Sequence, residues 1–177
     1  MGSSVHLRLA TRSTAHTVLL ELASTLVDRP RLTHDDAGRP HIPGLAVSIT
    51  HTDERSAVAA SYGGPVGIDL EEIHPRNVRP LADRWFSPRE LAWMASEADQ
   101  LRAFLRLWTA KEAVGKALGV GLRGAGLRRE MPIGGGAVES EPGLAVAYLP
   151  CDGAVLAVAA PLRVAVSPAL DPLCACG

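Results

Sequence analysis

The central segment of the chain reads Leu107-Trp108-Thr109-Ala110-Lys111-Glu112-Ala113-Val114-Gly115-Lys116-Ala117-Leu118-Gly119. It closes a long predicted helix over residues 98–118, which ends at Gly119 because glycine is common just past a helix C-terminus. The segment holds both lysines of the chain, Lys111 and Lys116, and the other sixteen basic residues are arginines. A compact ammonium suits a crowded metal–phosphate centre better than a rigid guanidinium fork. Compositional drift is the alternative explanation.

A second distinctive segment is the predicted strand over residues 65–71, Pro65-Val66-Gly67-Ile68-Asp69-Leu70-Glu71. Asp69 and Glu71 are two residues apart, so both side chains point to the same face of the strand. Glu112 and Lys116 are four residues apart and share a face of the helix. Two carboxylates on one face repel each other unless water, a proton or a cation lies between them.

If the long helix crosses this strand, the carboxylates of Asp69, Glu71 and Glu112 meet. Three oxygen ligands together with water suit Mg²⁺. Each feature also has an ordinary explanation when taken alone. Asp69 and Glu71 can form a polar strand end in water, and Glu112 with Lys116 can form a surface ion pair worth about 0.3–0.5 kcal/mol.

The rest of the pattern predicts an α+β protein. A capped helix is expected to begin at Ser87-Pro88-Arg89-Glu90, where serine caps, proline takes the first helical position and glutamate the third. Each part of the chain contains a helix followed by strands, which permits two similar halves, residues 1–64 and 65–177. Hydrophobic periodicity places the remaining helix and strands at residues 14–27 (helix), 45–49, 56–61, 145–149 and 155–160 (strands).

Composition excludes several classes of protein. The chain has 177 residues, of which 47% are hydrophobic, enough for one ordinary core. A formal net charge of −1 argues against nucleic-acid binding. No apolar run approaches the roughly 20 residues of a membrane span, and residues 1–8 lack a signal peptide's apolar stretch. We therefore expect a cytoplasmic protein. Three cysteines, an odd number, argue against a disulfide framework.

Taken together, the two segments resemble the paired signature of the 4′-phosphopantetheinyl transferase superfamily. That signature begins with a Gly-Ile/Val-Asp strand. About forty residues later comes a helix that reads Trp/Phe-Ser/Thr/Cys-x-Lys-Glu-Ala/Ser-x-x-x-Lys. Gly67-Ile68-Asp69 and Trp108 to Lys116 match it. Three other segments resemble those of the surfactin-type branch: Gly38-Arg39-Pro40, Val47-Ser48-Ile49-Thr50-His51-Thr52 and Arg84-Trp85-Phe86-Ser87-Pro88-Arg89-Glu90. The resemblance covers about residues 12 to 160.

The resemblance implies a pseudo-twofold fold of two similar α+β halves with the active site in the cleft between them. It also implies transfer of the 4′-phosphopantetheine arm of coenzyme A to a serine of an apo acyl or peptidyl carrier protein, with release of adenosine 3′,5′-bisphosphate. Mg²⁺ or Mn²⁺ on Asp69, Glu71 and Glu112 would clamp the pyrophosphate. Lys116 and Lys111 would add positive charge there. Glu112 would take the serine proton, directly or through a metal-bound water.

The same resemblance assigns the residues that meet the adenylate end of coenzyme A. His51 is expected at the 3′-phosphate with Thr50 beside it, where Thr50 stands in place of the usual serine. Arg39, in place of the usual lysine, is expected at the same phosphate or at the adenine edge, and Arg12 at another phosphate contact. Without this context, a histidine at a strand end is more often a local hydrogen-bonding residue.

The resemblance also implies a carrier protein as the protein partner. Carrier domains are typically acidic, so the basic and apolar side chains in residues 72–86 are expected to meet them. Arginines in this segment would contact the carrier, whereas Trp85 and Phe86 have core packing as their alternative role. No nucleic acid or membrane partner is expected. The rival interpretation is a non-catalytic module that binds coenzyme A or a carrier protein. The full set of Asp69, Glu71, Glu112 and Lys116 argues against it, because a simple binder does not need a metal site.

Overall fold

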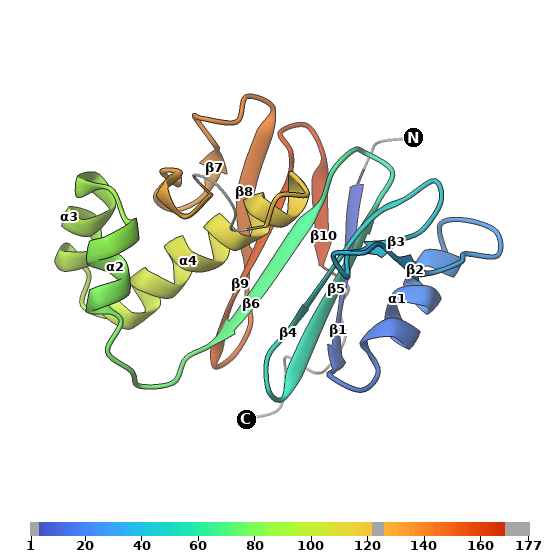
Figure 1. Ribbon diagram of the computed structural model, residues 1–177, viewed down its shortest axis with the longest axis horizontal. Coiled ribbons are helices and arrows are strands. Elements are labelled where there is room, and N and C mark those ends of the chain that lie inside the picture. The colour runs from blue at the N-terminus through green and yellow to red at the C-terminus, as the bar shows by residue number, and fades with distance from the viewer. Residues whose placement is uncertain (1–3, 122–125, 169–177) are drawn as a thin grey trace.

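Two four-stranded sheets lie side by side in the computed structural model, which describes residues 4–121 and 126–168 (Figure 1). The first sheet has the order β10-β1-β5-β4 and the second the order β6-β9-β8-β7. The α+β class expected from the sequence is confirmed. The strands of the two sheets are β1 (Ser4–Thr11), β4 (Ala46–His51), β5 (Arg55–Ser61), β10 (Ala165–Pro168), β6 (Gly67–Glu72), β7 (Gly136–Ala137), β8 (Leu144–Leu149) and β9 (Ala154–Pro161).

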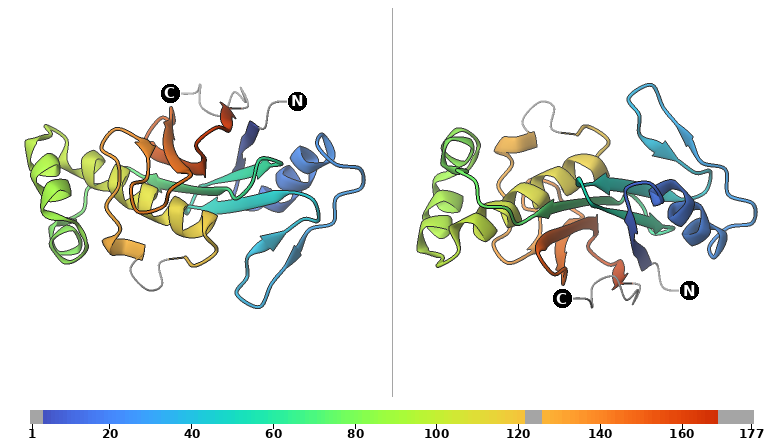
Figure 2. Two further views of the ribbon diagram at one scale, coloured as in Figure 1. Left: turned by 90° about the horizontal axis from the view of Figure 1, so that it is seen from above. Right: turned by 90° about the horizontal axis from the view of Figure 1, so that it is seen from below.

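The helices sit on opposite outer sides of this pair of sheets, as Figure 1 shows. Helix α1 packs on the first sheet, and the long helix α4 packs across β6 and β9 of the second. A small hairpin, β2 with β3, projects from the body of the molecule in both views of Figure 2. These elements are α1 (Ala15–Ser24), α2 (Arg79–Trp85), α3 (Pro88–Ser96), α4 (Gln100–Ala117), a short 3₁₀ turn (Gly126–Arg128), β2 (Thr33–His34) and β3 (Pro40–His41).

The first sheet contains both the earliest and the latest strand of the described chain. Strand β1 runs antiparallel to β5, and β5 runs antiparallel to β4. Strand β10 returns from the second half of the sequence and pairs with β1 in parallel, with Ser4 opposite Ala165. Residues 165–168 therefore lie in the sheet formed by residues 4–61. Internal similarity between the two halves stays a prediction.

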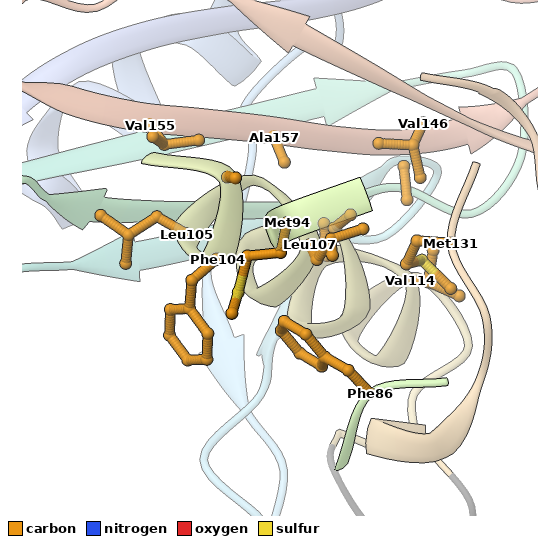
Figure 3. Packing of buried hydrophobic residues seen from close by; sticks show 14 of the residues in the cluster. Phe86, Met94, Phe104, Leu105, Leu107, Val114, Met131, Val146, Val155 and Ala157 are labelled. Atoms are coloured by element: carbon orange, nitrogen blue, oxygen red, sulfur yellow. The ribbon is translucent and has the colours of Figure 1, made fainter. Parts of the chain in front are cut away.

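Packing of α4 against the second sheet forms the largest group of buried apolar side chains. Figure 3 shows Phe104, Leu105 and Leu107 of this helix in one cluster with Val155 and Ala157 of β9. The aromatic rings continue the core outward, since Phe86 stacks on Phe104 with ring centroids 5.2 Å apart. Burial of such side chains contributes about 1.5–3 kcal/mol each. This packing fixes the position of the segment that holds Glu112 and Lys116.

Gly67 allows α4 and β6 to approach closely. A Cβ atom added at this position would overlap the carbonyl oxygen of Ala113 and would lie 2.5 Å from the backbone nitrogen of Ala117. Both are backbone atoms of the helix, so a side chain here would push the whole helix away from the strand. The glycine that precedes Asp69 in the sequence is therefore needed for the contact between helix and strand.

A second apolar cluster joins the two sheets to each other. It combines Val5, Leu7 and Ala59 of the first sheet with Ile68 and Leu156 of the second. The two halves thus share a core rather than folding as separate bodies. At the seam, β4 lies next to β6, yet main-chain pairing joins β4 only to β5 and β6 only to β9.

Most helices and strands lie where periodicity predicts them, with ends shifted by a few residues. Helix α3 begins with the expected cap, in which Ser87 and Glu90 bond each other's backbone N–H groups. The prediction did not include β1, β10 or α2. In β1, the buried Val5 and Leu7 alternate with the partly exposed His6 and Arg8. This short alternation near the start of the sequence resembles a polar terminus. Across residues 4–121 and 126–168, no helix is both long and apolar enough to cross a membrane.

Candidate active site

A cleft of about 770 Å³ opens between the β2–β3 hairpin, β4 and the C-terminal end of α4. Residues from both sides of the seam line it, among them Arg39 and Ser48 from the first half and Lys116 and Gly119 from the second. Arg39 reaches across the cleft, where its Nη1 donates to the Gly119 carbonyl oxygen at 2.5 Å and its Nε donates to Asp35 at 2.6 Å. A cationic group at the C-terminal end of a helix is favourable because the last carbonyl groups carry partial negative charge.

Asp69 and Lys116 meet beside this cleft. Lys116 Nζ donates to Asp69 Oδ1 at 2.8 Å and to the Ile68 carbonyl oxygen at 3.0 Å. The hydroxyl of Thr50 donates to the same Asp69 Oδ1 at 3.0 Å. Asp69 Oδ2 is buried and accepts no hydrogen bond from the residues that the structure describes. Burial raises the pKa of Asp69, and the charge of Lys116 opposes that effect.

Glu112 lies close enough to Asp69 for the two carboxylates to influence each other. Burial raises the pKa of Glu112 to about 7, and the negative charge of Asp69 acts in the same direction. Lys116 and a hydrogen bond from the Trp108 side chain oppose this rise. A carboxyl group with a pKa near neutrality is suited to exchange a proton under ordinary conditions.

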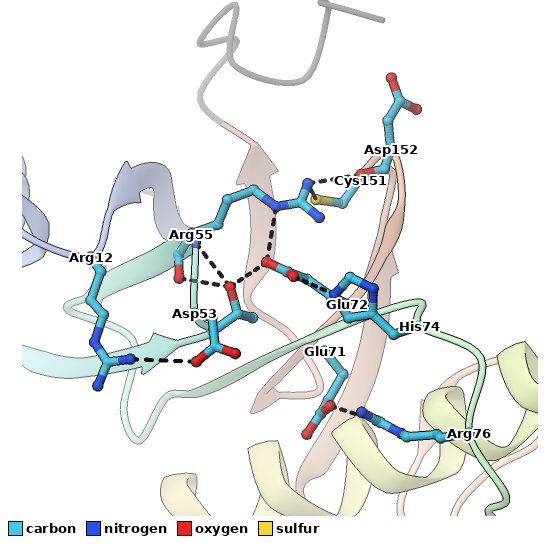
Figure 4. A network of polar contacts seen from close by, with 10 residues as sticks. Arg12, Asp53, Arg55, Glu71, Glu72, His74, Arg76, Cys151 and Asp152 are labelled. Atoms are coloured by element: carbon cyan, nitrogen blue, oxygen red, sulfur yellow. Dashed lines mark hydrogen bonds and ion pairs between the residues drawn. The ribbon is translucent and has the colours of Figure 1, made fainter.

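Glu71 stands at the outer edge of the same acidic group. Its Oε2 accepts from Arg76 Nη2 at 2.8 Å, as Figure 4 shows, and its side chain is 29% exposed. Its charge still acts on Asp69 and on Glu112, raising the pKa of each. Within the described parts of the chain, no three His, Cys, Asp or Glu side chains stand together in a ready metal-binding cluster. The three carboxylates are thus neighbours, but they do not converge on one point.

Positively charged groups gather around His51 at the end of β4. His51 Nδ1 lies 2.7 Å from the hydroxyl of Ser56. Burial lowers the pKa of His51, and the nearby charges of Arg12, His16 and Lys116 lower it further. Arg12 is exposed and forms a 3.7 Å ion pair with Asp53 (Figure 4). His16 carried no distinguishing signal in the sequence, because its neighbour His51 lies thirty-five residues away and only the fold joins them.

Comparison with known proteins places this geometry in a family. Residues 65–133, which contain Asp69, Glu71, Glu112 and Lys116, match the family model for the 4′-phosphopantetheinyl transferase superfamily. The 4′-phosphopantetheinyl transferase AcpT of Salmonella typhimurium is 38% identical over 104 residues, which cover 55% of this chain and 54% of the relative. Residues 65–133 thus carry the sequence of the 4′-phosphopantetheinyl transferase superfamily. The sequence-based recognition of this superfamily is confirmed.

Other relatives agree with this match. The 4′-phosphopantetheinyl transferase gsp of Aneurinibacillus migulanus is 35% identical over 91 residues, covering 50% of this chain and 38% of the relative. The 4′-phosphopantetheinyl transferase HetI of a Nostoc species is 38% identical over 82 residues, covering 45% of this chain and 35% of the relative. The chain matches about half, or less, of the length of these relatives.

The superfamily signature contains both lysines, and the structure places them in different environments. Lys111 is fully buried, and its Nζ donates to Glu90 Oε1 at 2.7 Å and to the carbonyl oxygen of Arg129. The ammonium also lies 5.1 Å from the centroid of the Phe86 ring. Burial lowers the pKa of Lys111, and the Glu90 charge opposes that effect. The structure does not bring Lys111 to the cleft.

The side chains expected to meet a carrier protein, in residues 72–86, also lie in different environments. Phe86 is buried in the core, whereas Trp85 is half-buried between two guanidinium groups. Arg84 lies 4.9 Å and Arg128 lies 5.3 Å from the centroid of the Trp85 ring. Arg79 pairs with Asp83 on the exposed side of α2. Trp85 and its arginines remain accessible to a partner, and Phe86 does not.

Proposed function

We propose that this protein transfers the 4′-phosphopantetheine arm of coenzyme A to a serine of an apo acyl or peptidyl carrier protein and releases adenosine 3′,5′-bisphosphate. The observation that carries the proposal is the pair of the buried Asp69 with Lys116 beside a cleft lined from both halves of the protein. Breaking a pyrophosphate linkage demands positioning and neutralisation of negative charge more than covalent help from the protein. The relatives' names support the same reaction class.

The donor set beside Lys116 fits a divalent cation. Asp69 Oδ2 is a buried carboxylate oxygen without a hydrogen-bond partner among the described residues. Burial raises the pKa values of both Asp69 and Glu112, and neighbouring carboxylates raise them further, which is the situation that a bound cation relieves. Asp69, Glu112 and Glu71 would hold Mg²⁺ or Mn²⁺ through oxygen atoms, with Glu71 first leaving Arg76. When bound, such an ion supplies charge neutralisation at the pyrophosphate.

Two residues of the chain act directly on the reacting groups in this proposal. The ammonium of Lys116 is partly exposed at the cleft and would neutralise charge on the departing phosphate. Glu112, with a pKa of about 7, would accept the proton of the carrier serine, directly or through a water molecule. The serine oxygen then forms its bond to the pantetheine-bearing phosphorus as the bond to the adenylate phosphate breaks.

Residues 1–64 would form the side that binds the adenylate end of coenzyme A, and residues 65–177 would carry the metal and catalytic motifs. His51 and Arg12 lie close to each other and carry or accept positive charge, which suits the 3′-phosphate. Arg39 lines the cleft and would contact the same phosphate or the adenine edge. Thr50 was expected beside His51 at this phosphate, and its hydroxyl bonds Asp69. Lys111 was expected at the pyrophosphate, and its ammonium bonds Glu90.

The carrier protein would approach over α2, where Arg84 and Arg128 flank Trp85. Guanidinium groups on an aromatic face present positive charge and apolar surface together, which complements an acidic helical partner. The rival function is a non-catalytic module that binds coenzyme A or a carrier protein. The two differ in one product: only an enzyme releases adenosine 3′,5′-bisphosphate in the presence of an apo carrier.

The deciding experiment incubates the protein with coenzyme A, MgCl₂ and a panel of apo acyl and peptidyl carrier proteins. Chromatography of the small molecules should show adenosine 3′,5′-bisphosphate that increases with time and requires a carrier with its serine intact. Binding of coenzyme A without any release of this nucleotide, across the whole panel, would favour the binding module.

A further inference from the structure

The seam between the two sheets is held by side-chain hydroxyls. Strands β4 and β6 lie next to each other without main-chain pairing between them. Ser48 Oγ instead accepts from the Ile68 backbone N–H at 3.2 Å. Thr50 Oγ1 donates to Asp69 at 3.0 Å, and Thr52 Oγ1 donates to Glu72 Oε1 at 2.5 Å. We call these three residues of β4 and its end the hydroxyl ladder.

The spacing of the hydroxyl ladder follows from strand geometry. Ser48, Thr50 and Thr52 alternate along the chain, so their side chains lie on the same face. Ser48 and Thr50 are buried, whereas His51, on the other face, is exposed. One strand therefore directs its hydroxyls toward β6 and its histidine toward the surface. Because threonine is branched at Cβ, its side-chain rotation is restricted and its hydroxyl direction is well defined.

The hydroxyl of Thr50 bonds Asp69, whose carboxylate is a proposed metal ligand. Asp69 Oδ1 receives both Thr50 and Lys116, while Asp69 Oδ2 receives no donor from the described residues. The ammonium of Lys116 sits on a long flexible stem and cannot by itself fix the rotation of the carboxyl group. A second donor from a rigid strand holds Oδ1 in one place and so determines where Oδ2 lies.

We propose that Thr50 is a positioning residue: its hydroxyl holds Asp69 Oδ1 so that Oδ2 is the atom offered to the divalent cation. This assignment rests on the proposed transferase function. It differs from a direct contact between Thr50 and the 3′-phosphate of coenzyme A. A hydroxyl has one proton to donate. While that proton bonds Asp69, only the lone pairs of Thr50 remain, and these repel a phosphate.

The hydroxyl ladder supplies its own control. Thr52→Val removes the same group from the same face of the chain, two residues from Thr50. Its acceptor, Glu72, keeps a bond from His74 at 2.8 Å and an ion pair with Arg55 at 3.6 Å (Figure 4). Glu72 is also not among the proposed metal ligands. A general effect of loosening the seam would appear in both variants, whereas loss of metal positioning would appear only at Thr50.

The test measures metal and nucleotide binding separately, without reference to turnover. Mn²⁺ binding is followed by electron paramagnetic resonance, and adenosine 3′,5′-bisphosphate binding is followed by calorimetry in EDTA. Thr50→Val should weaken Mn²⁺ binding by about tenfold or more, the usual consequence of losing a group that orients a metal ligand. Thr50→Ser, which restores the hydroxyl, and Thr52→Val should both bind Mn²⁺ with near wild-type affinity. Nucleotide binding in EDTA should be unchanged in Thr50→Val and weakened in His51→Ala.

Two results would overturn the assignment. One is wild-type Mn²⁺ affinity in Thr50→Val, or in Thr50→Ala if the valine variant does not fold. The other is loss of nucleotide binding in EDTA on removal of the Thr50 hydroxyl, which would instead place it at the phosphate. Failure of the proposed function is a separate result, because a protein that binds Mn²⁺ and nucleotide as expected but modifies no carrier would keep the positioning role and lose the enzyme.

Discussion

Lys116 Nζ and Asp69 Oδ1 lie 2.8 Å apart and connect the last turns of α4 to the strand that it crosses. The pair is formed by residues forty-seven positions apart, and the close approach of helix and strand at Gly67 makes it possible. The side chain of Asp69 is 6% exposed and that of Lys116 is 29% exposed. The carboxylate of Asp69 is therefore buried, whereas the ammonium of Lys116 reaches the cleft. Under the proposed function, this positive charge would meet a phosphate of coenzyme A.

Lys116→Arg is expected to lower turnover at least about tenfold, equivalent to about 1.4 kcal/mol of transition-state stabilisation. The wider guanidinium cannot bond both Asp69 and the Ile68 carbonyl oxygen while presenting one compact charge to the phosphate. The measurement is the steady-state rate of carrier modification at saturating coenzyme A. Wild-type turnover in this variant would mean that charge alone matters here and that the scarcity of lysine reflects composition.

Lys111→Met should behave differently from any change at Lys116. Removing one partner of the fully buried Lys111–Glu90 pair leaves an uncompensated charge and typically costs about 3–5 kcal/mol. We expect a large fall in the midpoint of urea unfolding, with turnover per folded molecule retained. The matched control is Arg79→Met, which breaks the exposed pair with Asp83 and should change stability by less than about 1 kcal/mol. A stable Lys111→Met protein with no turnover would return Lys111 to the active site.

The contribution of Glu112 to the stability of the metal-free protein should fall as pH rises from about 5.5 to 8. The pKa of Glu112 is raised to about 7 in the folded protein. The folded state thus holds a proton that the unfolded state releases near its ordinary value, so the stabilising contribution is present at low pH and is lost as pH rises through about 7.

The comparison is between wild type and Glu112→Gln, unfolded with urea in EDTA at both pH values. The glutamine variant should lose less stability than wild type between pH 5.5 and 8, because it has no proton to release at this position. Parallel behaviour of the two proteins would show that Glu112 titrates like an exposed glutamate.

Gly67→Ala should prevent normal packing of α4 on β6. The added Cβ would overlap backbone atoms of the helix, which cannot rotate away as a side chain can. The expected result is loss of the cooperative thermal transition in circular dichroism. Gly44→Ala is a suitable control because open space surrounds its added Cβ and only the backbone angle φ of +81° disfavours a side chain, at about 1–2 kcal/mol. A Gly67→Ala protein as stable as the control would contradict the close approach of helix and strand.

The sequence predicted those helices and strands whose periodic pattern of residues is visible within one short segment. The spacing of Glu112 and Lys116 along one helix, and the run from Gly67 to Glu71, required only helical and strand periodicity. Strands β1 and β10 were missed because each depends on a partner distant in sequence: Ser4 pairs with Ala165. Helix α2 was missed because Pro75 and Pro80 flank its start and favour a loop prediction, although proline is well tolerated in the first turn of a helix.

The candidate site was predictable in its residue types but not in its contacts. Spacing places Glu112 and Lys116 on one face of a helix, and the structure agrees in bringing both near Asp69. Spacing cannot show that Lys111, one residue from Glu112, turns inward to Glu90, since that depends on where α3 packs. Nor can it show which acceptor the Thr50 hydroxyl finds, since Asp69 lies on a strand from the other half.

The central claim is tested most directly by the intact mass of an apo carrier protein after incubation with this protein and coenzyme A. The account predicts a gain of one phosphopantetheine group with wild-type protein and Mg²⁺. It predicts no gain when EDTA replaces Mg²⁺, and none with Asp69→Asn, which keeps the shape of the side chain but removes its charge. Equal modification by wild type and a folded Asp69→Asn protein would contradict the account.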